Sequence, residues 1–339
     1  MNRMKLGEIL SVKHGWAFKG EYFAEDGEQS ILTPGNFFEK GGFKPNNGKE
    51  RYYLCHKGDL IVAMTQQAEG LLGSTALVPE NNKYLHNQRI GLITCDEKRL
   101  NKLFAYYLFM TKSVREQLER SSSGTKVKHT SPEKIYDVEV EIPDVISQQK
   151  IANLLWSIDE KIANNNAIND NLEQQAKLLY NYWFIQFNFP DENGNPYHSS
   201  GGQLVWNKNL QQEIPQDWRS GNLYDIADYI NGIACQKYRP SDEEHSLPVV
   251  KIREMNGGIT NDTERVSSTI PAKNIISSGD ILFSWSASLE VIMWYGVDAG
   301  LNQHIFKVVP KSYFSSEYVY LQLSEYLIHF IKIAEARKT

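Results

Sequence analysis

The sequence predicts an α+β fold in which two similar globular domains are separated by one long coiled-coil-forming helix. Between residues 151 and 183, seam positions recur in alternating steps of four and three, which is the heptad pattern of a coiled coil. Beyond residue 219 the chain repeats the first domain in outline. With 339 residues, the chain is too long for one average domain and fits two or three.

These observations divide the chain into four segments. We expect a first domain over residues 1–145, a long helix over 146–188, a connector over 189–218 and an incomplete second domain over 219–339. The repeat leads us to expect a second long helix after the second domain. No such segment follows in the sequence, so the second spacer helix is missing.

The composition is that of an ordinary soluble globular protein, with 41% hydrophobic and 23% charged residues. The net charge of −5 argues neither for nor against nucleic-acid binding, because a basic face can lie on an acidic protein. Cys55, Cys95 and Cys235 are too widely spaced to suggest a metal site or a disulfide framework. Without a signal peptide or a membrane-length apolar run, we expect a cytoplasmic protein.

The first domain combines short strands with two helices. Apolar runs bounded by polar or turn residues predict strands at residues 29–34, 60–64, 75–78, 89–93 and 138–143. Helices are expected at 103–108 and 114–118, and a polar loop at 121–130. A tight turn at Lys57-Gly58-Asp59 leads into the strand at 60–64.

The long helix is bounded by Pro143 and Pro190, as expected of helix ends. Its heptad seam needs a partner helix, because one face of a lone helix cannot bury itself. Asn165 and Asn169 make the middle of the seam polar, which favours one register and one choice of partner. About 40 residues would make a rod of roughly 60 Å. The alternative is a long amphipathic helix on one large domain. The seam comprises Ile151, Leu155, Ile158, Ile162, Asn165, Asn169, Leu172, Ala176, Leu179 and Trp183.

The connector is rich in turn residues, and we expect it to be ordered. The apolar side chains that could anchor it are Leu204, Val205, Trp206, Ile214 and Trp218.

The internal repeat rests on five short matches in the same order. Each match is weak alone, but the order is kept and the offset drifts only between 213 and 221. Residues 6–9 match 223–226, 15–17 match 232–234, 57–61 match 278–282, 85–90 match 300–305, and 107–108 match 320–321. The second copy lacks equivalents of residues 124–143 and of the long helix.

Two similar domains on a rod resemble the specificity subunit of type I restriction–modification systems. The resemblance covers the whole chain. It is carried by residues 5–9, the turns at Gly58-Asp59 and Gly279-Asp280, the Asn-Gln pairs at 87–88 and 302–303, the start of the long helix at 142–152, and the connector at 201–218.

The resemblance implies two target-recognition domains, each reading half of a split site in double-stranded DNA. It implies helices that pair antiparallel and dock methyltransferase subunits, and a restriction or motor subunit that joins them. It implies no catalytic residue, cofactor or metal in this chain. Because the family pattern continues beyond the last residues seen here, we hypothesise a recombination product or a C-terminally truncated chain. Its open seam would pair with a second copy or with a methyltransferase subunit.

Candidate DNA-binding residues are the amide, hydroxyl, cationic and aromatic side chains near predicted strand ends and loops. In the first domain they are Lys13, His14, Trp16, Lys19, Thr65, Gln66, Gln67, Thr125, Lys126, Lys128 and His129. In the second domain they are Gln236, Lys237, Tyr238, Arg239, Lys251, Arg253, Trp285, Ser286 and Ser288. For each of them the alternative is an ordinary solvated surface residue. Asn87 and Asn302 recur in both domains, which favours a shared structural hydrogen bond over base reading.

Catalytic functions find little support in the sequence. It contains no GxSxG nucleophile motif, no phosphate-binding loop and no glycine-rich cofactor loop after a strand. The eight histidines show no metal-ligand spacing. The alternatives to a DNA-recognition subunit are a scaffold or stalk protein with duplicated domains, and an inactive recombination reservoir. Salt-sensitive binding to DNA would separate the first of these from a specificity subunit.

Overall fold

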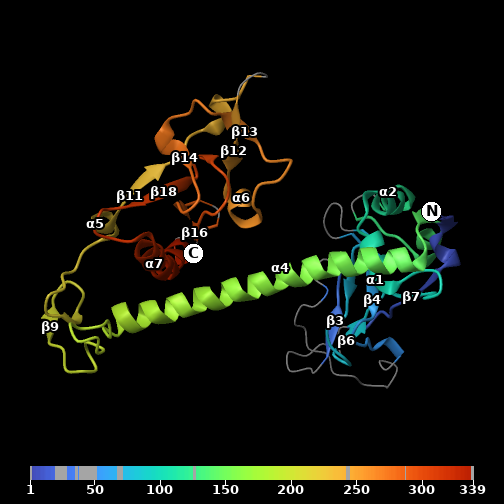
Figure 1. The fold of residues 1–339 in the computed structure, drawn as a ribbon, viewed down its shortest axis with the longest axis horizontal. Helices are drawn as coiled ribbons and strands as arrows, with labels where there is room; N and C mark the ends of the chain where they lie inside the picture. The colour runs from blue at the N-terminus through green and yellow to red at the C-terminus, as the bar shows by residue number, and fades with distance from the viewer. Residues whose placement is uncertain are drawn as a thin grey trace. The chain divides into compact units, whose positions relative to one another are not determined.

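The computed structural model describes residues 2–19, 29–34, 37, 52–66, 72–124, 127–241, 245–286 and 288–336. The chain forms two compact units, Met1–Ala167 (unit 1) and Ile168–Thr339 (unit 2), and the boundary falls within the long helix. The predicted α+β architecture, with two similar units and one long helix, is confirmed (Figure 1).

Unit 1 is built on an antiparallel sheet with the strand order β2-β7-β4-β5. Its strands are β2 (Leu10–His14), β4 (Leu60–Ala63), β5 (Thr75–Leu77) and β7 (Ile90–Cys95). All four residues of β4 are buried, as expected of a central apolar strand. On one face the sheet packs against Phe109 and Leu118, which come from the helical segment that follows β7.

Smaller elements complete unit 1. Strand β3 (Ser30–Leu32) pairs in parallel with β6 (Tyr84–His86), and β1 (Asn2–Lys5) pairs with β8 (Glu139–Ile142). The helices are η1 (Leu6–Glu8), α1 (Lys102–Leu108), α2 (Lys112–Ser121) and α3 (Pro132–Tyr136). All predicted strands and helices of the first domain are confirmed. Strand β6 was not predicted, because three consecutive buried residues show no alternation.

Helix α4 (Val145–Tyr180) continues into one π-helical turn, Asn181–Ile185. The helix begins one residue before the predicted start, and together with the π-helical turn it ends at Ile185, three residues before the predicted end. The Asp144 carboxylate accepts hydrogen bonds from the backbone N–H and the hydroxyl of Ser147, at 2.9 and 2.8 Å, and these hold the pKa of Asp144 below its usual value. At 1.5 Å per residue, the α-helical part is about 54 Å long.

The connector is ordered, as predicted, and contains the hairpin of β9 (Leu204–Asn207) and β10 (Gln212–Pro215). Trp218 anchors it by stacking on Phe189, with ring centroids 5.2 Å apart, and Ile214 is buried. The prediction that Val205 and Trp206 are anchors was wrong, because both are exposed on the hairpin, Trp206 by 62%.

Unit 2 repeats the main sheet of unit 1 with the strand order β11-β18-β15-β16. Its strands are β11 (Ala227–Asn231), β15 (Ile281–Ser284), β16 (Glu290–Met293) and β18 (Ile305–Pro310). A second sheet has the order β13-β12-β17-β14, and its parallel pair β12–β17 matches β3–β6. These strands are β12 (Ser246–Val250), β13 (Arg265–Ser267), β14 (Ile275–Ile276) and β17 (Ala299–Leu301).

The helices of unit 2 are α5 (Leu223–Ile226), η5 (Cys235–Lys237), α6 (Ile252–Gly257), η6 (Ala272–Asn274) and α7 (Ser316–Ala336). Helix α7 is one continuous helix of 21 residues, whereas the matching segment of unit 1 forms the two helices α1 and α2. In the described residues, no helix combines the length and the apolar character needed to cross a bilayer.

Candidate nucleic-acid interface

The two Gly-Asp turns have the same geometry in both units. Gly58 and Gly279 adopt φ values of +81° and +95°, a conformation that favours glycine. The carboxylates of Asp59 and Asp280 each accept a hydrogen bond of 2.7 Å from the backbone N–H three residues earlier. These turns therefore have a structural role, as predicted for the two glycines. We refer to them, together with the asparagine turns described next, as the frame of each unit.

The two recurring asparagines are also part of this frame. Asn87 is buried, and its Oδ1 atom accepts a hydrogen bond of 2.8 Å from the backbone N–H of Arg89. Asn302 accepts the equivalent bond from His304 at 3.4 Å. The predicted structural role of the asparagines is confirmed, and their side chains hold a tight turn that precedes β7 and β18.

A glycine lies against each of these turns. A Cβ atom on Gly15 would lie 1.9 Å from the carbonyl oxygen of Asn87, and one on Gly232 would lie 2.1 Å from that of Asn302. In each unit the residue after the glycine forms a parallel β-bridge with the asparagine. The close approach of two backbones explains why glycine recurs at this position.

Strands β2 and β4 of unit 1 end at the same edge of the sheet, because both are antiparallel to β7, which lies between them. His14, the last residue of β2, pairs with Gly91, and Ala63, the last residue of β4, pairs with Ile90. The segments that follow these strands therefore flank the start of β7. The sequence candidates of the first domain that the structure describes lie at the end of β2, directly after β2 and β4, and in the loop between α2 and α3.

The loop at 121–130 is bound to the end of β4. Thr65 and His129 form a β-bridge, and the Thr65 hydroxyl lies 3.1 Å from His129 Nδ1. Gln66 donates its backbone N–H to the Lys128 carbonyl at 2.9 Å. Four predicted candidates are thus brought together, although the Lys128 ammonium already pairs with Glu119. Gln67, Thr125 and Lys126 lie outside the described residues.

The candidates after β2 form an aromatic and cationic cluster. The Lys13 ammonium lies 5.1 Å from the ring centroid of Tyr53, within cation–π range. Trp16 stacks on the same ring at 5.8 Å. Lys13, His14 and Lys19 are exposed, and Trp16 is half-buried. From the sequence, the aromatic residue beside these cations was Trp16; in the structure Lys13 contacts the ring of Tyr53 instead.

Beneath this cluster lies a buried histidine. His86 is fully buried, and burial lowers its pKa to about 4, so its imidazole is neutral at physiological pH. Its Nδ1 atom lies 3.1 Å from the Tyr53 carbonyl and 3.9 Å from Cys55 Sγ. Burial raises the pKa of the Cys55 thiol to about 12. Both groups are therefore uncharged parts of the core.

The candidates of unit 2 fall into three groups. Gln236, Lys237, Tyr238 and Arg239 are exposed on and directly after η5. A second group follows β15, where Trp285 is 44% exposed, Ser286 is half-buried and Ser288 is exposed. Because β15 matches β4, Trp285 and Ser286 occupy the places of Met64 and Thr65. The third group consists of Lys251 and Arg253.

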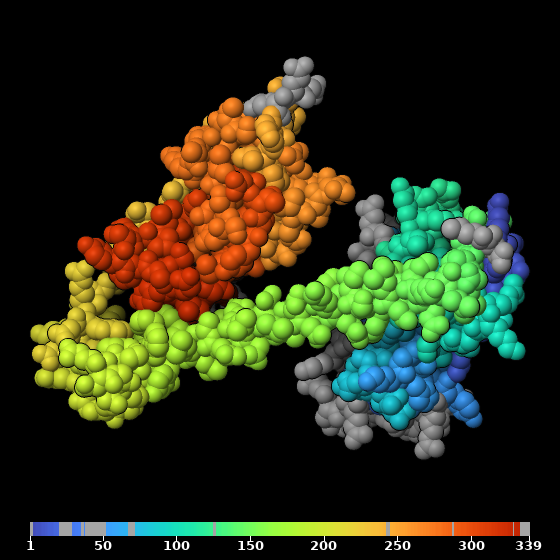
Figure 2. Space-filling view, in the orientation of Figure 1, coloured from blue at the N-terminus to red at the C-terminus, as the bar shows by residue number. Residues whose placement is uncertain are grey.

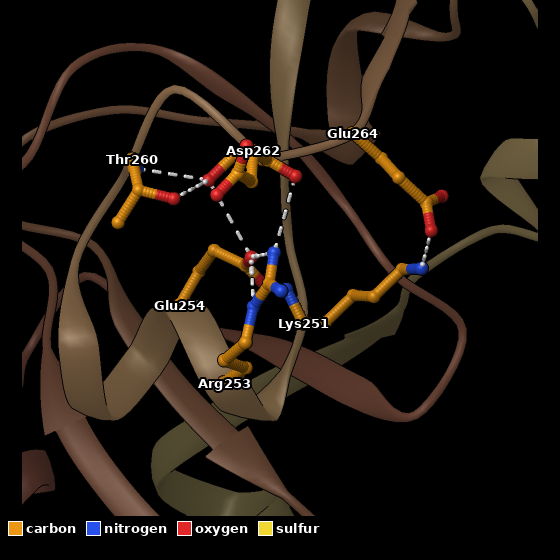
Figure 3. A network of polar contacts seen from close by, with 7 residues as sticks. Lys251, Arg253, Glu254, Thr260, Asp262 and Glu264 are labelled. Atoms are coloured by element: carbon orange, nitrogen blue, oxygen red, sulfur yellow. Dashed lines mark hydrogen bonds and ion pairs between the residues drawn. The ribbon is translucent and has the colours of Figure 1, made fainter. Parts of the chain in front are cut away.

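Lys251 and Arg253 belong to a network of ion pairs within unit 2 (Figure 3). The Arg253 guanidinium donates two hydrogen bonds, of 2.9 and 2.6 Å, to the buried carboxylate of Glu254. Lys251 Nζ lies 2.5 Å from Glu264. A DNA contact by either cation would have to share or break these pairs, so of the predicted candidates these two have the clearest structural role.

Each unit binds α4 through a tyrosine at matching positions of the repeat. In unit 1 the Tyr107 hydroxyl donates to Asp159 at 2.6 Å, and in unit 2 the Tyr320 hydroxyl donates to Glu173 at 3.4 Å. In unit 2, Tyr180 of α4 also donates to Gln322 at 2.6 Å. The match of 107–108 with 320–321 was the sequence signal for this contact, but its role was not recognised.

Atoms of α4 lie at the surface of the face drawn in Figure 2. The seam residues themselves are largely exposed. Ile162 and Leu172 are 52% and 57% exposed, and only Ala176 and Trp183 of the seam are partly covered. Asp159 and Glu173, which bind the units, directly follow the seam residues Ile158 and Leu172. The contacts with the units therefore use side chains beside the seam and leave the seam open.

Sequence reasoning missed the exposed side chains on the turns before β7 and β18. These are Gln88 and Arg89 in unit 1, which are exposed, and in unit 2 His304, which is exposed, with the half-buried Gln303 beside it. The recurrence of Asn-Gln in both units was the signal that could have found them. Among the described residues, no group of three or more His, Cys, Asp or Glu side chains could hold a metal ion.

Comparison with known proteins agrees with this duplicated frame. Residues 1–174 match the family described as "Type I restriction modification DNA specificity domain". The chain belongs to this family. The type I restriction enzyme MjaIX specificity subunit of Methanocaldococcus jannaschii is 30% identical over 156 residues, which cover 46% of this chain and 34% of the relative. The HindI specificity subunit of Haemophilus influenzae is 22% identical over 332 residues, which cover 79% of this chain and 70% of the relative.

The fold is also similar to that of a solved specificity subunit. A crystal structure of the type I restriction–modification S subunit from M. genitalium has a TM-score of 0.59 and 16% identity, and the match covers 99% of this chain and 79% of that one. The match with MjaIX spans about a third of that relative, so the similarity concerns the specificity domain and the fold.

Proposed function

We propose that this chain is a non-catalytic subunit of a type I restriction–modification complex that selects a bipartite site in double-stranded DNA. Each unit reads one half-site, and α4 sets the separation between the half-sites. The observation that carries this proposal is the duplicated frame. Matching turns in both units present different side chains at the matching sheet edge, which is what two readers of different half-sites require.

The partners in this proposal are methyltransferase subunits and a restriction or motor subunit, which supply the catalysis and the cofactors. The open seam supports a helical partner, because burying one exposed Ile or Leu side chain contributes about 1.5–3 kcal/mol. The partner helix comes from a methyltransferase subunit or from a second copy of this chain.

The experiment begins with co-expression of the chain and the methyltransferase subunit encoded beside it, followed by selection on random duplex DNA. We expect an enriched split motif with a fixed gap, and binding that weakens steeply with salt as counterions are released. A single symmetric half-site would indicate that two copies pair and that unit 2 is silent. No enriched motif and no salt-dependent binding would refute the proposal and favour a scaffold protein.

The seam is tested separately by Leu172→Lys, with Asn164→Lys as the control. Both side chains are exposed on α4, but only Leu172 belongs to the seam. We expect Leu172→Lys to abolish co-purification of the helical partner and Asn164→Lys to retain it. Equal co-purification with both variants would place the partner elsewhere.

A further inference from the structure

Hydrogen bonds hold the backbone of the turn before β7 in place. The N–H of Arg89 donates to the Asn87 side chain at 2.8 Å, and the Arg89 carbonyl accepts from the Met64 N–H at 2.8 Å. The N–H of Gln88 donates to the Trp16 carbonyl at 3.1 Å. The backbone of the turn is therefore held on both sides, while the side chains of Gln88 and Arg89 are exposed.

Arg89 differs from the other arginines in the described part of unit 1. Arg3 and Arg120 pair with carboxylates, and Arg99 and Arg115 donate to backbone carbonyls. Among the same described residues, the Arg89 guanidinium has no such partner. An arginine fork with all its donors free, on a turn whose backbone is fixed, is suited to an external acceptor.

Sequence candidates flank Arg89 on both sides. Neighbouring strands lie about 4.8 Å apart, so the ends of β2 and β4 lie about 10 Å from each other across β7. Trp16 follows β2, and Thr65 and Gln66 follow β4. This edge is comparable in width to the major groove of B-DNA, which is about 12 Å wide. Arg89 lies near its middle.

Unit 2 has the same turn with a different side chain. The Asn302 side chain accepts from the His304 N–H, and the Trp285 N–H donates to the His304 carbonyl at 3.3 Å. These bonds repeat those that Asn87 and Met64 make with Arg89. The frame is therefore conserved between the units, while the residue that it presents changes from Arg89 to His304.

We propose that the turn before β7, with its counterpart before β18, is a base-reading element, and that Arg89 donates hydrogen bonds to guanine O6 and N7 in the half-site of unit 1. This inference rests on the proposed DNA-recognition function and deepens it. The arginine fork matches these two guanine acceptors in the major groove, which is the commonest specific contact between proteins and DNA. His304 occupies the corresponding position in unit 2, where its ring can form a single hydrogen bond with a base of the other half-site.

The test compares Arg89→Ala with Arg120→Ala in the same methyltransferase complex and the same selection on random duplex DNA. Arg120 is an exposed arginine on α2, so both variants remove one positive charge from the surface of unit 1. A two-acceptor arginine contact gives a preference of roughly 5- to 150-fold for guanine. We expect this preference to vanish at one position in Arg89→Ala, while all other positions and the whole motif of Arg120→Ala are unchanged.

Three outcomes would overturn the inference. A uniform loss of affinity in Arg89→Ala, with a salt slope lower by about one and an unchanged motif, would make Arg89 a phosphate contact. A motif and affinity equal to those of Arg120→Ala would remove Arg89 from the interface. Absence of any motif in the unmodified complex would refute the proposed function, and the inference with it. His304→Ala provides the second readout, because it should change one position in the other half-site alone.

Discussion

Replacing Gln148 by alanine tests how α4 is fixed to unit 1. Gln148 is fully buried at the start of the helix. Its Nε2 atom donates to the carbonyls of Arg99 and Pro143 at 3.0 and 2.9 Å, and its Oε1 atom accepts from the Asn101 N–H at 2.9 Å. The side chain thereby satisfies three backbone groups at the start of α4.

The expected cost follows from these three bonds. Each buried hydrogen bond contributes about 0.5–1.5 kcal/mol net, so Gln148→Ala should lower the free energy of unfolding of unit 1 by about 3 kcal/mol. For a unit the size of Met1–Ala167, this corresponds to a melting temperature lower by about 6–12 °C. Calorimetry of the full chain measures the shift, and hydrogen exchange should show lost protection of the Asn101 amide.

The neighbouring residue provides a matched control. Gln149 is exposed, so Gln149→Ala removes the same side chain without removing these bonds. It should change the melting temperature by less than about 2 °C. If Gln148→Ala melts within 2 °C of Gln149→Ala and the Asn101 amide keeps its protection, the three bonds do not fix α4 and the reasoning is refuted.

Three further predictions concern the core of each unit. Gly15→Ala should destabilise unit 1 by about 1–3 kcal/mol in a urea titration, because its Cβ would meet a backbone carbonyl at 1.9 Å. Burial lowers the pKa of His86 to about 4 from an ordinary value near 6.5. Between about pH 4 and 6.5 the unfolded chain therefore binds more protons at His86 than the folded chain does. Unit 1 should therefore lose about 3 kcal/mol as pH falls from about 6.5 to 4, and His86→Gln should remove this step. Arg253→Ala should cost about 1–3 kcal/mol in thermal unfolding of unit 2, since it leaves the Glu254 carboxylate buried with weaker partners.

Each of these predictions has a control and a contradicting result. Gly257→Ala meets no atom within 4 Å and should be tolerated, so equal losses for both glycine variants would contradict the close-approach argument. An unchanged pH dependence in His86→Gln would assign the acid step to other groups. Lys251→Ala breaks only a surface pair and should cost less than about 1 kcal/mol. A loss as large as that of Arg253→Ala would show that burial of Glu254 is not the cause.

The shared frame was predictable from the sequence because it depends on local rules. A glycine with positive φ before an aspartate, and an asparagine that bonds two residues ahead, leave recognisable residues at fixed spacing. The heptad seam was predictable for the same reason. In each case the chemistry of a few consecutive or regularly spaced residues decides the structure.

The candidate site was only partly predictable, because strand pairing creates it. Arg89 lies between the ends of β2 and β4 only through the order β2-β7-β4, which brings residues 14 and 64 to the same edge. Arg253 was predicted as a DNA contact from its charge and its place in the repeat. In the structure, Arg253 pairs with the carboxylate of Glu254, which is buried. The burial of Glu254 depends on the packing of α6 and could not be predicted from the sequence.

The open seam and the neighbouring contacts of α4 separate two kinds of mutation. A change at Ile158 or Leu172 alters what pairs with the helix, whereas a change at Asp159 or Glu173 alters how a unit holds it. Because adjacent residues of a helix point about 100° apart, these two sets of side chains face different surroundings. The surface of the seam and the attachment of the two units can therefore change independently along one helix.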